Sequence, residues 1–317
     1  MSMQRRALML AGVAAAGTAR AQSFATRPIR MIVPFPPGGA VDVVARMLTA
    51  PLSELLGQPV VVETRPGAGA TIGAAAVATA PHDGHTILFT SAALASAAAV
   101  VANPGYDAIR DLAPLSLLGA VPLVLTASLS LGVDDMAGLL AAARARPGAI
   151  TYASPGNGTP IHLAMELLKR EAGIDLLHVP YRGSPVADVL AGRVGLHLDS
   201  APAAVSRGRQ GQVRLLGIST PKRIASLPEV PAIAETVAGY DATTWYGFFA
   251  PARVPGPILT ALSEALVTVT SRPALREWLV GQGVEVDASG PGLLGRLLAT
   301  DTERWGAIAR SVGARLD

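Results

Sequence analysis

Two glycine-rich loops carry the residue types best suited to binding a small anion. The first loop, residues 34–39, reads PFPPGG, and the second loop, residues 154–159, reads SPGNGT; each follows a short apolar run and precedes a helical pattern. A loop between a strand and a helix presents unpaired backbone N–H groups at the positive end of the helix dipole, where a carboxylate or phosphate binds. The loops lie about 120 residues apart, which predicts two domains facing each other across one anion.

The first loop offers backbone donors and is followed by one acidic side chain. Prolines stiffen it, and two successive glycines let a ligand approach the chain closely. Asp42, in the first turn of the next helix, either stabilises the helix N-terminus or orients a bound water. The loop has neither the G-x-G-x-x-G spacing of a dinucleotide site nor the lysine of a P-loop, which argues against a nucleotide. The candidate ligand-binding residues here are Phe35, Pro36, Gly38, Gly39 and Asp42.

The second loop and the ends of other expected strands supply the opposing wall. Ser154, Asn157 and Thr159 are neutral hydrogen-bond donors, and Thr159 is also a candidate N-cap, which would be a purely structural role. His162, three residues into the helix, fits either packing or ligand contact. Ligands in open parallel sheets collect at the carboxyl ends of the strands. The remaining candidates are Thr71, Ser91, Gly158, Tyr181 and Asp199.

The sequence contains no recognisable catalytic or metal-binding motif. It has no G-x-S-x-G or H-E-x-x-H pattern, its five histidines are scattered, and it has no cysteine. The lack of cysteine excludes a thiol nucleophile and a thiolate metal site. We therefore expect no catalytic residue, no metal and no cofactor. An exported hydrolase or isomerase of small organic acids remains the alternative, because a catalytic triad can be built from distant segments.

The N-terminus predicts export. Arg5 and Arg6 precede an apolar run over residues 7–19, and Ala19-Arg20-Ala21 supplies the small residues of a cleavage site. Residues 1–21 are therefore expected to be a secretory signal peptide and the mature protein periplasmic, by the general or the twin-arginine route. The segment holds three of the 26 basic residues and no acid, which leaves 23 basic against 23 acidic residues. A neutral protein without a basic, aromatic-rich patch is not expected to bind nucleic acid.

The rest of the chain alternates between strand-like and helical patterns, which predicts an α/β fold with two doubly wound, parallel sheets. The uncharged stretch 112–133 is long enough to cross a membrane, but its Pro, Gly and β-branched residues favour a buried strand. Strands are expected at 29–33, 60–63, 86–89, 121–126, 149–153, 176–179, 195–199, 213–218 and 245–250.

Three helical stretches end the chain after the pattern of the second sheet is complete. They need a sheet to pack against, and the first sheet is the simplest choice. We therefore expect a discontinuous domain I of residues 24–121 plus 247–317, a domain II of residues 122–246, and a hinge where two strands cross between them.

Six segments in order carry a family pattern that covers nearly the whole chain after the signal peptide. They are RPIRMIVPFPPGGAVDVVAR (27–46), RPGAGATIGAAAVATAPHDGHTILF (65–89), TYASPGNGTPIHLAMELLKREAG (151–173), HVPYRGSPVADVLAGRV (178–194), VRLLGISTPKRIASLPEVPAIAE (213–235) and TTWYGFFAPARVP (243–255). Together they resemble the periplasmic solute receptors of the tripartite tricarboxylate transporter family, also called the Bordetella uptake protein or Bug family. The chain departs from that pattern at Ala70, where a second Gly is frequent, and at His85, where Tyr is usual.

The resemblance implies a hinged, type II periplasmic binding protein that closes on a small carboxylate and delivers it to integral membrane transporter subunits; we expect a monomer. In the family, backbone amides and ordered water hold one carboxylate, at positions that here are Phe35–Gly39 with Asp42, and Ser154–Thr159. Asp199 matches an acidic position of the family. Members differ in ligand, from tricarboxylates and dicarboxylates to acidic amino acids, aromatic acids and neutral derivatives, and the sequence does not choose among them.

Overall fold

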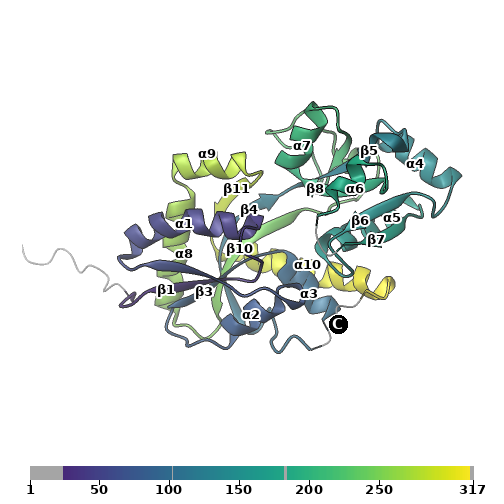
Figure 1. Ribbon diagram of the computed structural model, residues 1–317. Coiled ribbons are helices and arrows are strands. Elements are labelled where there is room, and N and C mark those ends of the chain that lie inside the picture. The colour runs from purple at the N-terminus through teal and green to yellow at the C-terminus, as the bar shows by residue number, and fades with distance from the viewer. Residues whose placement is uncertain (1–23, 102, 182–183, 315–317) are drawn as a thin grey trace, which may run out of the picture.

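The computed structural model describes residues 24–101, 103–181 and 184–314 (Figure 1). The expected signal peptide, residues 1–21, and Arg182 lie outside these ranges. The described chain forms two α/β units, each built on its own sheet. No described helix is long and apolar enough to cross a membrane.

The first unit is built on a six-stranded sheet with the order β11-β4-β10-β3-β1-β2. β1, β2 and β3 are parallel, whereas β10 runs antiparallel to β3 and β4, and β11 antiparallel to β4. The strands are β1 Ile29–Val33, β2 Val60–Thr64, β3 Thr86–Ser91, β4 Leu112–Val121, β10 Thr244–Pro251 and β11 Glu285–Ser289. The helices are α1 Ala40–Leu56, η2 Ala68–Ala70, α2 Thr71–Ala78, α3 Ala93–Val100, α8 Gly256–Thr270, α9 Pro273–Gly281 and α10 Pro291–Ser311.

The second unit is built on a five-stranded sheet with the order β7-β6-β8-β5-β9. β6 is parallel to β7 and β8, and β5 is antiparallel to β8 and β9. The strands are β5 Leu123–Ser128, β6 Thr151–Ser154, β7 Leu177–Pro180, β8 Leu196–Ser200 and β9 Val213–Ile218. The helices are η3 Leu129–Leu131, α4 Met136–Ala145, α5 Pro160–Ala172, α6 Val186–Leu190, α7 Ala201–Arg209 and η4 Ile233–Glu235.

The chain passes between the two sheets twice. The first crossing is Pro122 alone, between β4 and β5, and a proline has no N–H to continue a strand ladder. The second crossing, residues 219–243, leads from β9 to β10. Because β4 and β10 carry the chain in opposite directions and pair side by side, the expectation of all-parallel sheets is wrong at these strands.

The first sheet contains more of the chain than the sequence suggested. Within the uncharged stretch 112–133, where one strand was expected at 121–126, residues 112–121 form β4 of the first sheet and residues 123–128 form β5 of the second. β11 of the first sheet was not expected at all. Residues 244–246, which the sequence assigned to domain II, pair with β4 in the first sheet. At Gly119 of β4, a Cβ atom would lie 2.3 Å from the carbonyl oxygen of Glu285 in β11. Only glycine therefore permits β11 to approach this closely.

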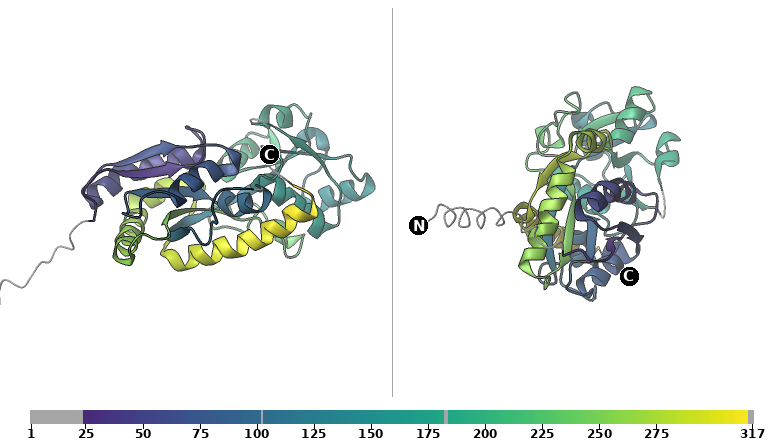
Figure 2. Two further views of the ribbon diagram at one scale, coloured as in Figure 1. Left: turned by 90° about the horizontal axis from the view of Figure 1, so that it is seen from below. Right: turned by 90° about the vertical axis from the view of Figure 1, so that its left-hand side faces the viewer.

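Helix α10 joins the two units along one side of the molecule (Figure 2). It packs against α3 of the first unit and α5 of the second. Trp245 of β10 donates its Nε1–H to Asp301 Oδ2 at 2.8 Å, and burial raises the pKa of Asp301. Arg304 donates to Asp301 Oδ1 at 2.8 Å and to the carbonyl oxygen of Asp241 at 2.7 Å. These bonds tie α10 to the second crossing.

The hydrophobic core is continuous between the units. One buried cluster includes Leu94 and Leu117 of the first unit, Leu163 and Leu168 of α5, and Trp305 of α10. The two units are therefore packed against each other where α10 contacts both.

Candidate functional site

A cleft of about 790 Å³ lies between the two units, bordered by both predicted loops. Six of the predicted ligand-binding residues line it: Phe35, Pro36, Ser91, Gly158, Thr159 and Asp199. The other eight, Gly38, Gly39, Asp42, Thr71, Ser154, Asn157, His162 and Tyr181, do not. Several of these eight instead support the residues that face the cleft.

The first loop leads into α1, whose N-terminus faces the cleft. Gly39 is the N-cap residue in an extended conformation, and no side chain caps the helix. Ala40 and Val41, the first two helical residues, line the cleft. The first turn of a helix has backbone N–H groups without intrahelical partners and a partial positive charge. An anion in the cleft can therefore be bound at this helix end, as the sequence predicts.

The buried carboxylate of Asp42 holds the first loop in place by a hydrogen bond. Its side chain is only 2% exposed, and Oδ2 accepts hydrogen bonds from the backbone N–H of Gly38 at 2.8 Å and from Arg46 Nε at 2.9 Å. The hydrogen bond from Arg46 is the main cause that lowers the pKa of Asp42. Oδ1 is buried and has no partner among the described residues. The sequence offered helix stabilisation or the orientation of a bound water; the contacts of Oδ2 show a further role, which is to fix the loop.

The second loop is held by its own hydrogen bonds. Thr159 caps α5, accepting from the N–H of His162 at 3.4 Å and donating to the carbonyl oxygen of Gly156 at 2.8 Å. Ser154 is fully buried, and its Oγ lies 2.6 Å from Nε2 of His178. The N–H of Gly158 donates to Nδ1 of His162 at 3.0 Å. Ser154 and the Gly158 N–H therefore support the loop, and they are not free donors as the sequence suggested.

The remaining predicted residues divide between the cleft and other roles. Thr71 is buried and donates to the carbonyl oxygen of Ala68, while Tyr181 donates to Asp188 at 2.6 Å. Ser91 does line the cleft, and its Oγ accepts from the N–H of Ala93. Asp199 lines it too.

Asp199 has two partners in the structure. Its carboxylate forms an ion pair with Arg207 of α7 and accepts a hydrogen bond from the N–H of Ser200. Asp199 is the only Asp, Glu, Lys or Arg among the described residues that line the cleft. A bound anion would therefore meet no cationic side chain among them, and this acidic group is already neutralised by its arginine.

Several lining residues were missed by the sequence analysis because they come from the crossings. Val121 and Leu123 flank Pro122, and Thr244 and Tyr246 belong to β10. For Tyr246 the sequence signal is the aromatic run at 245–250, which was assigned to a strand but not to the cleft. With Phe35 and Ile161 they make much of the wall apolar.

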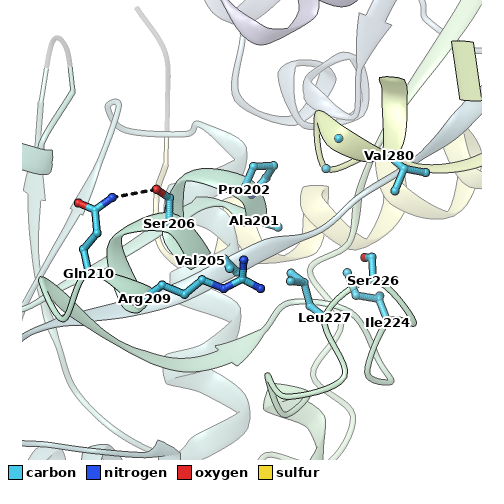
Figure 3. Close-up of a pocket in the computed structure, with 12 residues that line it drawn as sticks. Ala201, Pro202, Val205, Ser206, Arg209, Gln210, Ile224, Ser226, Leu227 and Val280 are labelled. Carbon is cyan, nitrogen blue, oxygen red and sulfur yellow. Dashed lines mark hydrogen bonds between the residues drawn. The ribbon is translucent and has the colours of Figure 1, made fainter. Parts of the chain in front are cut away.

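Figure 3 shows another cavity, of about 590 Å³, to which both units also contribute. Pro202, Ser206 and Arg209 of α7 lie on one side of it and Val280 of α9 on the other. None of the predicted ligand-binding residues lines this cavity. The cleft between the loops is therefore the candidate binding site. No group of three or more His, Cys, Asp or Glu residues in the described chain is arranged to hold a metal ion.

Residues 44–314 match the family model described as "Tripartite tricarboxylate transporter family receptor". The chain belongs to this family. The match extends over both units and includes the second loop, α5 and the strands that cross between the sheets. The resemblance inferred from the six sequence segments is thereby confirmed.

Relatives with known names or structures cover nearly the whole of this receptor. Protein BugT of Bordetella pertussis is 36% identical over 313 residues, 96% of this chain and 95% of BugT. An R. palustris protein solved with adipate is 32% identical, with a TM-score of 0.79 over 92% of this chain and 99% of that one. MatC from Rhodopseudomonas palustris, solved with bound malate, is 29% identical, with a TM-score of 0.77 over 90% and 99%.

These relationships establish the class of protein. The chain is a solute-binding receptor of the tripartite tricarboxylate transporter and Bug type, with the two-sheet α/β fold of periplasmic binding proteins. The family and its solved members are receptors and not enzymes, so the non-enzymatic interpretation is confirmed and the alternative of an exported hydrolase or isomerase is set aside.

Proposed function

We propose that this receptor is exported to the periplasm, closes its two units on a small carboxylate, and delivers it to the membrane subunits of a tripartite tricarboxylate-type transporter. The observation that carries the proposal is the uncapped N-terminus of α1 in a cleft whose other wall is the second loop. Helix N-termini of this kind bind carboxylates. Two solved relatives with adipate and malate support the same ligand class.

The composition of the cleft supports a particular way of binding. None of the described lining residues is Lys or Arg, so the carboxylate would be bound by backbone N–H groups, hydroxyls and water. Among the hydroxyl-bearing residues of the lining, Ser91 accepts from the N–H of Ala93 and so has its own O–H to donate. The apolar wall around Phe35 and Leu123 favours a ligand whose remaining surface is largely a carbon skeleton.

Ligand capture would involve motion of the two units as domains. We propose a domain I of residues 24–121 plus 244–317 and a domain II of residues 122–243, hinged at Pro122 and at the end of the second crossing. A ligand that contacts both walls shifts the population toward the closed form. Small-angle scattering should show a smaller radius of gyration at saturating ligand. An unchanged radius despite proven binding would refute domain closure.

Export by a cleaved signal peptide is part of the proposal. The mature chain should begin near Gln22 and be recovered as a monomer from the periplasmic fraction. Intact mass, cell fractionation and sedimentation test these points together, and a chain that keeps residues 1–21 contradicts the export step.

The binding mechanism is tested by calorimetry on a panel of small carboxylates that includes malate and adipate. Gly39→Val should lower the affinity at least about tenfold, because it crowds the first loop and disturbs several charge-assisted hydrogen bonds together. Arg65→Ala is the matched control: Arg65 pairs with Glu63 at 2.6 Å and does not line the cleft. Arg182→Ala should also retain binding. Loss of binding in an arginine variant, with normal binding by Gly39→Val, would overturn the mechanism.

A further inference from the structure

A stacked pair of histidines lies directly beneath the second loop. The ring centroids of His162 in α5 and His178 in β7 are 4.2 Å apart, with the planes inclined by 18°. Tyr152 of β6 stacks on His178 at 4.9 Å, so the three rings form one packed column. The histidines are separate in sequence, and only the pairing of β6 with β7 brings them together.

Each histidine contacts a different part of the second loop. His162 Nδ1 accepts the backbone N–H of Gly158 at 3.0 Å. His178 Nε2 lies 2.6 Å from Ser154 Oγ, which in turn accepts the N–H of Gly156 at 3.1 Å. The first contact requires an unprotonated Nδ1, so His162 must be neutral with its proton on Nε2. Both ends of the loop are thereby attached to the ring column.

The surroundings keep the pair neutral. His162 is only 7% exposed, and burial lowers its pKa. Burial and the neighbouring His162 lower the pKa of His178 to about 4. Glu166 is a charged group beside the pair, and its Oε1 lies 4.0 Å from His162 Nε2.

The charge of Glu166 is already engaged by other groups. Its Oε1 accepts a hydrogen bond from Tyr152 of β6 at 2.6 Å and one from Lys169 at 3.0 Å. Lys169 also lies 3.6 Å from Asp175, in the connection before β7. Since this carboxylate is shared with a lysine and a phenol, it gives a protonated histidine little support.

We propose that His162 and His178 are positioning residues that hold the second loop in the conformation that faces α1 across the cleft. Gly158 and Thr159 line the cleft, whereas the two histidines do not line it and contact the loop on its other side. Protonation of His162 would place a donor against the Gly158 N–H, and the loop would have to move. The loop should therefore keep its conformation at neutral pH and lose it when the column is protonated.

The test pairs variants that separate the acceptor atom from the ring. His162→Asn keeps an acceptor near the Nδ1 position, while His162→Phe keeps the ring and removes the acceptor. Amide hydrogen exchange at Gly158, followed by NMR, should be about tenfold faster in His162→Phe. It should change less than about threefold in His162→Asn. His82→Asn, at an exposed histidine, is the control for a surface change. Equal exchange in both His162 variants would overturn the proposal.

Two further measurements keep the test decisive if a variant fails to fold. Ring ¹⁵N shifts of the wild-type protein at pH 7 should show His162 protonated on Nε2 alone; a proton on Nδ1 would overturn the proposal. His178→Gln should retain affinity for malate or adipate better than His178→Phe. This last readout rests on the proposed function. If the wild-type protein binds neither acid, the ligand proposal fails for them while exchange and tautomer still decide the positioning role.

Discussion

The attachment of the first loop to Asp42 predicts a defined order of stability among three variants. Asp42→Ala removes the acceptor for the Gly38 N–H, a charge-assisted bond that contributes about 1.5–3 kcal/mol. It also removes a carboxylate from the first turn of α1, worth about 0.3–1 kcal/mol. The bond to Arg46 adds only about 0.3–0.5 kcal/mol, because that side chain is 55% exposed. The expected cost of Asp42→Ala is therefore about 2–4.5 kcal/mol.

The other two variants, Asp42→Asn and Arg46→Ala, each remove only part of the contacts that Asp42→Ala removes. Asp42→Asn keeps a neutral acceptor for Gly38 and should lose roughly half as much, since a neutral hydrogen bond is about half as strong as a charge-assisted one. Arg46→Ala should lose about 0.5 kcal/mol or less. Urea unfolding followed by circular dichroism measures all three. If Arg46→Ala costs as much as Asp42→Ala, the exposed ion pair and not the loop bond stabilises this region, and the reasoning is refuted.

The pH dependence of Asp42 follows from the same contacts. Its pKa is lowered in the folded protein, with the hydrogen bond from Arg46 as the main cause and that from the Gly38 N–H as another. Water screens the exposed Arg46, so the Gly38 bond is expected to contribute more to stability. The stabilisation is therefore present above the unfolded pKa of about 3.9 and is lost as the pH falls through the folded value. In Asp42→Asn the free energy of unfolding should no longer fall with the titration of this group at acid pH. Its dependence on pH near neutrality should be the same as in the wild-type protein.

Three other predictions concern the crossing strands and the ring column. Gly119→Ala should separate β11 from β4 and cost several kcal/mol in urea unfolding, because the new Cβ would lie 2.3 Å from the Glu285 carbonyl oxygen; a cost under about 0.5 kcal/mol would contradict this packing. Trp245→Phe should cost about 1.5–3 kcal/mol by leaving buried Asp301 without its indole donor, and thermal unfolding of both proteins tests it. Because the pKa of His178 is lowered to about 4, the unfolded chain takes up a proton first, and stability should fall between about pH 6.5 and 4. His178→Gln should flatten that decline, measured by unfolding at several pH values, and an equally steep decline would exclude His178 as its source.

Strand and helix patterns in the sequence predicted most elements of the two units because burial follows local periodicity. Ile29–Val33 and Val213–Ile218 form strands with the predicted bounds. β11 was missed because Glu285–Ser289 is only five residues long and is recognised in the structure by its pairing with β4. The antiparallel direction of β10 was missed for a similar reason: strand direction depends on where the chain crosses between sheets, which is a property of the whole fold.

The candidate site could be located from the sequence, but not its internal roles. Glycine-rich loops before helices mark where backbone donors gather, and both loops border the cleft. The sequence could not show that Ser154 turns inward to His178, or that Gly158 donates to His162. Those contacts depend on tertiary pairing of β6, β7 and α5. The sequence also could not show that Asp199 of β8 pairs with Arg207, because the contact depends on how the following helix, α7, packs.

We propose that the cleft binds one small carboxylate without a cationic side chain from the described lining. The most direct measurement is mass spectrometry of ligand released from the protein purified from the periplasm, followed by calorimetry with that compound. We expect one small organic acid per chain, recovered chemically unchanged after incubation, whose affinity falls at least about tenfold in Gly39→Val and is retained in Arg65→Ala. Release of only a non-acidic solute, or turnover of the bound acid, would contradict it.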